Sequence, residues 1–155
     1  MFSWICLIIA FAGPYWGTEV VQVQKTGNAV SFVFDISWSM TAQDVLCEDS
    51  SYITRLDGAK LLAKKLLLPN KNEDTVSVSV VLAKGEGYVA VPLTEDHEAI
   101  FSIINALSPN LMTSKGSNIG AGIETAITSF PSTQARHGTI VVFTDGEEFD
   151  VAQGA

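Results

Sequence analysis

Two apolar runs, each followed by an aspartate, limit most strongly what this chain can fold into. Residues 29–34 read Ala-Val-Ser-Phe-Val-Phe before Asp35, and residues 139–143 read Thr-Ile-Val-Val-Phe before Thr144 and Asp145. Continuous β-branched and aromatic runs are typical of strands buried on both faces of a parallel sheet. We therefore expect both aspartates to lie where a buried strand meets a loop.

Three further segments show the apolar spacing of amphipathic helices. They begin near residues 54, 94 and 117, and a proline-containing turn follows each of them. Thr54 and Thr94 are the expected N-caps of the first two, because a threonine hydroxyl can accept a hydrogen bond from an N–H of the first turn. Residues 41–53, before the first helix, are polar and predict an irregular loop.

The segment between the first two helices predicts a β-hairpin. Residues 75–83 alternate polar and apolar side chains, residues 84–87 form a glycine-containing turn, and residues 88–91 return as a second strand. The order of strands and helices predicts a three-layer, doubly wound, Rossmann-like α/β fold. Its sheet is mostly parallel with one antiparallel edge strand. Because the chain ends soon after the last strand, we expect a domain that is incomplete at its C-terminus, with an exposed edge strand and marginal stability.

Composition narrows the class of protein. The 155 residues suit one domain, and 47% of them are hydrophobic, which is enough for a core. The formal net charge of −8 argues against a nucleic-acid partner, because phosphate binding requires clustered Lys and Arg. Cys6 and Cys47 lie in unrelated settings, so we expect both to be unpaired.

The N-terminal segment, residues 1–17, differs from the domain expected at residues 18–155. Its apolar run is too short to span a bilayer, which needs about 20 residues. It could be the end of a transmembrane helix, the core of a signal peptide, or a buried strand or helix. A Gly-Pro-Tyr-Trp-Gly turn follows the run, and its aromatic pair suits a membrane interface.

The motif Asp35-Ile-Ser37-Trp-Ser39 carries the chemistry. Alternate residues can point to one side, so one carboxylate and two hydroxyls converge. These hard oxygen donors suit Mg²⁺, with Mn²⁺ and Ca²⁺ as alternatives, and suit soft metals poorly. A cation held by hydroxyls and only two carboxylates stays under-neutralised, so it attracts a carboxylate from a partner.

The motif is joined by a Gly-Ser-Asn-Ile-Gly segment at residues 116–120 and by Phe-Thr-Asp-Gly at residues 143–146. Over residues 29–148 the pattern resembles the von Willebrand factor type A fold and its metal-ion-dependent adhesion site. The resemblance implies five metal-site residues: Asp35, Ser37, Ser39, Ser117 and Asp145. It implies direct binding by the two serines of the first motif and water-mediated binding by the two aspartates. Ser117 replaces the family's threonine and keeps its hydroxyl, and Asn118 stands where a related subgroup often has Asp.

Finer features resemble that subgroup, the bacterial membrane-anchored Bat (aerotolerance-type) proteins. They are Ala12-Gly13-Pro14 with Trp16, Asp44-Val45 with Arg55-Leu56, and Pro92-Leu93-Thr94. The resemblance implies a domain between transmembrane helices, at the bacterial inner membrane and on its periplasmic side. It also implies that the protein works together with MoxR-type AAA+ ATPases and with other proteins of the same fold.

Other interpretations stay open. Asp35 could be the nucleophile of a metal-dependent phosphatase, although the second Asp of such enzymes is replaced by Ser37. The domain could be a scaffold with an inactive site. Ser117 could serve only as a helix N-cap, and Asp145 could belong only to a turn. Trp38 either packs on the core or lies exposed as a contact residue. His97 and His137 are expected in solvated or capping roles, and Gly120 and Gly122 are expected to allow close helix–strand packing.

Overall fold

The computed structural model describes residues 29–47, 50–67, 76–130 and 138–147. The strands of its main sheet are β1 (Ala29–Asp35), β4 (Ser77–Lys84), β5 (Glu86–Thr94) and β6 (Gly138–Phe143). Three α-helices follow the periodicity of the sequence: α2 (Arg55–Leu67), α3 (His97–Ala106) and α4 (Ile119–Ser129). Two short 3-10 helices, η1 (Trp38–Thr41) and η2 (Pro109–Leu111), lie in the connecting loops.

The sheet has the strand order β5-β4-β1-β6. Strand β1 pairs in parallel with β4 on one side and β6 on the other, and β5 pairs antiparallel with β4 at the edge. The predicted mostly parallel sheet with one antiparallel edge strand is therefore confirmed. The chain passes from β1 to β4 on one side and later returns to β6 on the other side. The carboxyl end of β1 is therefore the switch point of the sheet, the place where ligands bind in open α/β sheets.

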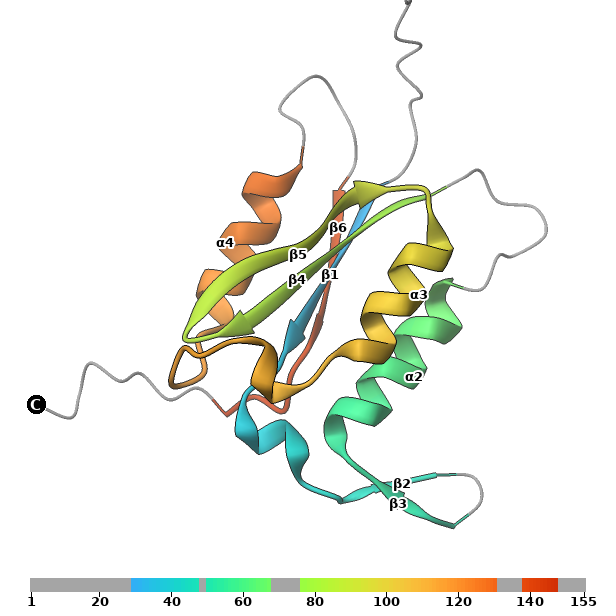
Figure 1. Ribbon diagram of the computed structural model, residues 1–155, viewed down its shortest axis with the longest axis vertical. Helices are drawn as coiled ribbons and strands as arrows, with labels where there is room; N and C mark the ends of the chain where they lie inside the picture. Colours follow the sequence, from blue (N-terminus) through green and yellow to red (C-terminus); the bar gives the residue numbers. More distant parts are fainter. Residues whose placement is uncertain (1–28, 48–49, 68–75, 131–137, 148–155) are drawn as a thin grey trace, which may run out of the picture.

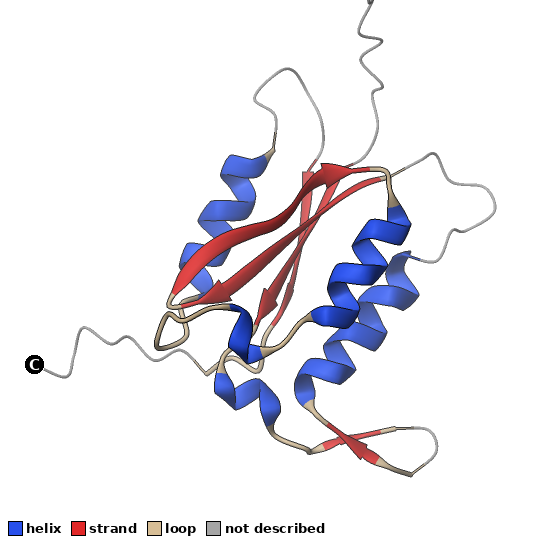
Figure 2. Cartoon of the chain, in the orientation of Figure 1, coloured by secondary structure: helices blue, strands red, loops and turns tan. Residues whose placement is uncertain are grey.

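Helices cover both faces of the sheet, which confirms the three-layer architecture (Figures 1 and 2). Helices α2 and α3 pack on one face against the larger apolar cluster, which includes Phe32, Phe34 and Leu82. Helix α4 covers the other face, where Val33, Val81 and Ala126 form a second cluster. Alternate residues of β1 thus serve the two cores, as expected for a strand buried on both faces.

Aromatic packing and a hydroxyl pair stabilise the central strands. The rings of Phe34 and Phe143 stack with their centroids 4.7 Å apart, which joins β1 to β6. On the other face of β1 the hydroxyl of Ser79 donates a hydrogen bond of 2.9 Å to the hydroxyl of Ser31. Both serines are fully buried, and the mutual hydrogen bond offsets the cost of removing them from water.

Glycine allows α4 to lie close to the sheet. A Cβ atom at Gly122 would come within 2.7 Å of the Ala83 Cβ and 3.0 Å of a Val33 methyl group. The close helix–strand packing expected at this residue is therefore confirmed. At Gly120 the same atom would meet nothing closer than the Asn118 side chain, at 3.4 Å, so that part of the expectation is wrong.

The N-caps are only partly as predicted. The Thr54 hydroxyl accepts a hydrogen bond from the Asp57 N–H, as expected at the start of α2. Thr94 ends β5 instead of capping α3, and the cap is Asp96, whose carboxylate accepts from the Ala99 N–H. Strand pairing extends far enough along β5 to include Thr94, which is opposite Val78.

The loop predicted to be irregular at residues 41–53 holds a short antiparallel pair, β2 (Val45–Leu46) with β3 (Tyr52–Ile53). This prediction was wrong, because two-residue strands leave no periodic signal. Strand β6 lies at an edge of the main sheet that the described residues form, as expected for the last strand.

The N-terminal predictions, for residues 1–17 and for the start of the domain at residue 18, lie outside the described residues. So do those for Cys6 and His137. Within the described part of the chain, no helix is long and apolar enough to cross a membrane. Cys47 forms no disulfide there, in agreement with the prediction for that residue.

Candidate metal centre

The candidate site lies where the carboxyl ends of β1 and β6 meet the loops before η1 and α4 (Figure 1). Two glycines shape these loops. Gly116 precedes Ser117 with a φ of 89°, and Gly146 follows Asp145 with a φ of 80°. Other residues rarely adopt this left-handed conformation, so both glycines favour the sharp turns that place the neighbouring side chains at the site.

Asp35 is the centre of the hydrogen-bond network. Its side chain is fully buried, and its Oδ1 accepts a 2.8 Å hydrogen bond from the Ser37 N–H. Its Oδ2 accepts from the hydroxyls of Ser117 and Thr144, each at 3.2 Å. Three segments that are distant in sequence therefore converge on one carboxylate. A buried charge requires such donors, because an unpaired carboxylate would be costly to remove from water.

A second chain of hydroxyls joins the first motif to Asp145. The hydroxyl oxygens of Ser37 and Ser39 are 2.9 Å apart. A hydrogen bond from Ser39 is one of the interactions that lower the pKa of Asp145. The Ser39 hydroxyl therefore links Ser37 to Asp145. All five predicted residues therefore lie in one connected set of contacts.

Arg55 is the cation of this site. Its Nη1 donates to Asp145 Oδ2 at 2.7 Å, and its Nε and Nη2 donate to the carboxylate of Asp44 at 2.6–3.0 Å. Burial acts to raise the pKa of Asp145. The hydrogen bond from Arg55, with those from the Glu147 N–H and Ser39, outweighs burial and leaves the pKa below its usual value. The pKa of Arg55 is raised, first by Asp44 and then by Asp145.

Ser117 is not the N-cap of α4. That role belongs to Asn118, whose side-chain oxygen accepts from the Ala121 N–H at 2.9 Å. The Ser117 hydroxyl is directed at Asp35 instead, and the residue is 3% exposed. The interpretation of Ser117 as only a cap is therefore wrong. Capping is a role that the amide oxygen of Asn118 fulfils as well as a carboxylate would.

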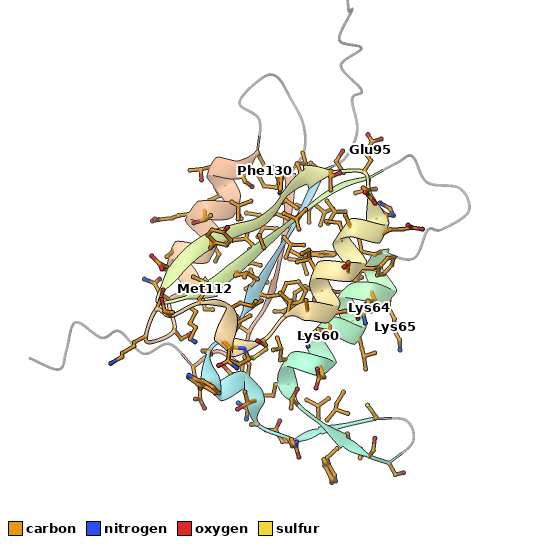
Figure 3. The ribbon with its side chains drawn as sticks, viewed as in Figure 1. Lys60, Lys64, Lys65, Glu95, Met112 and Phe130 are labelled. Atoms are coloured by element: carbon orange, nitrogen blue, oxygen red, sulfur yellow. The ribbon has the colours of Figure 1, made fainter. Side chains whose placement is uncertain are left out.

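Trp38 lies at the surface beside the site. Its residue is 63% exposed, so the alternative of packing on the core is wrong. One face of the ring meets the Nζ of Lys84, 5.4 Å from the ring centroid. Lys84 is itself buried and donates to the carbonyl oxygens of Pro109 and Met112, the latter at 3.0 Å. Lys84 thus ties the loop that holds Met112, which is labelled in Figure 3, to the end of β4.

A groove of about 780 Å³ opens next to these side chains, between α2 and β6. Arg55 and Asp145 line it together with Asp44, Phe143 and Glu147. Arg55 and Asp44 are therefore reached from solvent, whereas the side chain of Asp145 is only 6% exposed.

The donor set fits a hard divalent cation. Two carboxylates and three serine hydroxyls are oxygen ligands of the kind that Mg²⁺, Mn²⁺ and Ca²⁺ bind. Among the described residues there is no group of three or more His, Cys, Asp or Glu side chains that could hold a metal. Every buried side-chain oxygen or nitrogen in the described ranges has a hydrogen-bond partner, so the metal-free network is complete in itself.

Sequence reasoning missed two participants. Thr144 was part of the Phe-Thr-Asp-Gly motif but received no role, and its hydroxyl donates to Asp35. Arg55 was noted only for its resemblance to Bat proteins, yet it binds Asp145 directly. The signal for Thr144 was its position beside Asp145. No local signal could pair Arg55 with an aspartate 90 residues away.

Fold and site define a three-layer α/β domain with side-chain oxygens gathered at the switch point of the sheet. The model of the von Willebrand factor type A domain matches residues 30–148, and the chain belongs to this family.

Two solved structures of Bat-type proteins are similar to this chain, as the motifs indicated. An aerotolerance-related membrane protein from Bacteroides fragilis is 32% identical with a TM-score of 0.68. The match covers 80% of this chain and 57% of that one. The conserved hypothetical protein BatB from Bacteroides thetaiotaomicron is 30% identical with a TM-score of 0.65, over 75% of this chain and 52% of its own.

An uncharacterized protein of Borreliella burgdorferi is 26% identical over 140 residues, which is 90% of this chain and 38% of that protein. The chain thus spans little more than half the length of the two solved structures and less than half of this relative.

Proposed function

We propose that this chain is a metal-dependent protein-interaction domain, in which a bound Mg²⁺ ion accepts a carboxylate from a partner protein. The proposed metal ligands, direct or through water, are Asp35, Ser37, Ser39, Ser117 and Asp145. One observation carries the proposal: the fully buried carboxylate of Asp35 holds hydroxyls from two other segments at the switch point of the sheet. Mn²⁺ and Ca²⁺ suit the same ligands.

The hydrogen-bond directions support cation binding by the hydroxyls. Ser117 directs its proton at Asp35, so the lone pairs of its oxygen stay available. Thr144 likewise donates its proton to Asp35. Asp35 therefore orients hydroxyl oxygens toward a cation without having to contact it, which agrees with a water-mediated role for this carboxylate.

Charge supports the choice of a carboxylate as the partner's ligand. The site has two carboxylates, and Arg55 already pairs with one of them, Asp145. A divalent cation bound there keeps net positive charge, and a partner's Asp or Glu side chain would neutralise it. The exposed ring of Trp38 beside the site offers apolar contact area to the same partner.

Within the described residues, neither Lys84 nor His97 is placed to act as a general base at the site. Lys84 is buried and engaged by two carbonyl oxygens. His97 begins α3 and lies near the start of β4, at the end of the strands away from the site, where its Nε2 is 3.3 Å from the Val76 carbonyl oxygen. We therefore favour binding over the phosphatase alternative and expect no turnover of phosphoesters.

Similarity to an aerotolerance-related membrane protein supports the cellular setting of the proposal. We propose a membrane-associated role at the bacterial inner membrane, with this domain on the periplasmic side. A MoxR-type AAA+ ATPase system and other von Willebrand factor A proteins are the proposed partners. Each of these must present an Asp or Glu side chain to the metal.

The first experiment is calorimetric titration of the chain with Mg²⁺ and Mn²⁺. We expect one site, with affinity lowered at least about tenfold in Asp35→Asn and in Ser117→Ala, because each loses an oxygen or a charge that organises the site. Ser79→Ala is the matched control. It removes a buried hydroxyl of the same sheet, paired with Ser31, and should leave metal affinity unchanged.

The second experiment tests the interaction. Membrane proteins are captured on the immobilised chain with Mg²⁺, with EDTA, and with Mg²⁺ plus excess acetate. Capture that requires the metal and is reduced by acetate supports the proposal. A folded wild-type chain that binds no divalent cation would refute it and favour the metal-free scaffold.

A further inference from the structure

Arg55 occupies a position that its own helix does not favour. It is the first residue of α2, and its backbone N–H donates to the Ala42 carbonyl oxygen at 3.0 Å. A helix N-terminus carries partial positive charge, so a cationic side chain there is unfavourable and acidic residues are preferred. The two carboxylates that Arg55 binds, Asp44 and Asp145, account for its presence.

Three of its donor groups are already used. The Nε and Nη2 groups bind Asp44, whose side chain is 51% exposed, and Nη1 binds Asp145, which is almost completely buried. Asp145 uses both oxygens, because its Oδ1 also accepts from the Glu147 N–H. Arg55 is therefore poorly placed to capture a partner's carboxylate itself. Its charge instead acts on the metal centre.

We propose that Arg55 sets the charge of the metal centre by neutralising Asp145, so that the cation is held weakly by the protein and strongly attracts a partner's carboxylate. This inference rests on the proposed function. The guanidinium of Arg55 and the proposed cation are both positive and both close to the carboxylate of Asp145, so they repel each other. Because Asp145 is buried, water and salt screen this repulsion little. Metal affinity is lowered as a result, and the carboxylate affinity of the bound metal is raised.

Asp44, at the surface, reduces the effect of Arg55 on the metal centre. It lies in the loop between η1 and β2 and shares the charge of Arg55 with Asp145. In a variant with a neutral side chain in place of Asp44, the full charge of Arg55 acts on Asp145, and metal affinity should fall. Removal of Arg55 should instead raise metal affinity. A purely structural role of the ion pair predicts instead that both substitutions weaken metal binding.

The test compares Mg²⁺ affinities of the 155-residue chain by calorimetry. We expect Arg55→Gln to bind Mg²⁺ on the order of tenfold more tightly than wild type, and Asp44→Asn to bind it several-fold more weakly. Arg55→Lys keeps the positive charge but loses the planar guanidinium group, and its Mg²⁺ affinity should stay close to that of wild type. If Arg55 only positions Asp145, then the lysine and glutamine variants should both bind more weakly, and the proposal is wrong.

Two controls match the change in net charge. Lys60→Gln removes a positive charge from the same helix, where Lys60 forms an ion pair with Asp57 (Figure 3). Glu98→Gln removes an exposed negative charge from α3. Neither should change Mg²⁺ affinity by more than about twofold, because the charge of Lys60 is already paired with Asp57 and the exposed charge of Glu98 is screened. Equal effects in the controls would show that net charge alone is responsible, which would overturn the proposal.

A metal-free measurement gives an independent result. Without divalent cations, Arg55→Gln should lower the unfolding temperature, because Asp145 loses its cation while it remains buried. Saturating Mg²⁺ should then raise the unfolding temperature of Arg55→Gln more than that of wild type, since tighter binding stabilises more. An equal or smaller rise would contradict the proposal.

The carboxylate affinity is measured by titrating acetate into Mn²⁺-saturated protein. Acetate should bind the Arg55→Gln variant at least threefold more weakly than wild type, and unchanged acetate binding would overturn this part. If wild type binds no metal, the proposed function fails. If wild type binds metal and Arg55→Gln binds it equally or less tightly, only the role of Arg55 fails.

Discussion

Exchange of Gly122 for alanine probes the contact that places α4, and with it Ser117, against the sheet. The new Cβ would lie 2.7 Å from the Ala83 Cβ and 3.0 Å from a methyl group of Val33. Both neighbours are fully buried and belong to central strands, so they have little room to move. Helix α4 must therefore shift away from the sheet, or the strands must bend.

Two opposing effects give the magnitude. Overpacking a buried site costs about 1–3 kcal/mol. Replacing glycine by alanine inside a helix is worth about 1 kcal/mol in the other direction. For Gly122→Ala we expect the steric cost to dominate and stability to fall by about 1–2 kcal/mol. Gly120 offers a control on the same helix, because its Cβ would meet only the Asn118 side chain at 3.4 Å.

Urea unfolding followed by circular dichroism measures both variants. Gly120→Ala should be as stable as wild type or up to about 1 kcal/mol more stable, since it gains helix propensity without a clash. The two variants should thus differ by about 1–3 kcal/mol, which is the steric cost at Gly122, because both gain helix propensity. Equal stability of the two variants would show that α4 packs less closely than the structure indicates, and the reasoning would fail.

Three further predictions concern stability. Phe34→Ala should cost about 3–5 kcal/mol in urea unfolding, because it removes a fully buried ring stacked on Phe143. A loss below 1 kcal/mol would contradict that core. Lys84→Met should cost about 1–3 kcal/mol, because two loop carbonyl oxygens lose their donor. Unchanged stability would argue against that loop anchor. The pKa of Asp57 is lowered, first by the Thr54 hydroxyl and also by Lys60. Its contribution is therefore present above the usual value of 3.8 and lost as the pH falls through the lowered pKa. Asp57→Asn should flatten the stability profile in that acidic range by less than about 1 kcal/mol, since the side chain is half exposed. An unchanged profile would exclude this role.

Local pattern was enough to predict the main strands and helices. The run before Asp35 and the run before Thr144 are apolar because both faces of β1, and much of β6, meet other layers. Helical spacing predicted α2, α3 and α4 because each buries one stripe against the sheet. Local pattern was insufficient where two residues could do the same task. Thr94 and Asp96 are both good N-caps, and the choice depended on how far β5 pairs with β4.

The sequence by itself determined which side chains gather at the candidate site, because hydroxyls and carboxylates at strand ends are recognisable from their neighbours. Tertiary structure decided how these groups share protons and charge. Ser117 donates to Asp35 and leaves the capping of α4 to Asn118, since the strand order brings β1 beside the start of that helix. Arg55 meets Asp145 for a similar reason: α2 begins beside the end of β6, and only folding brings those two ends together.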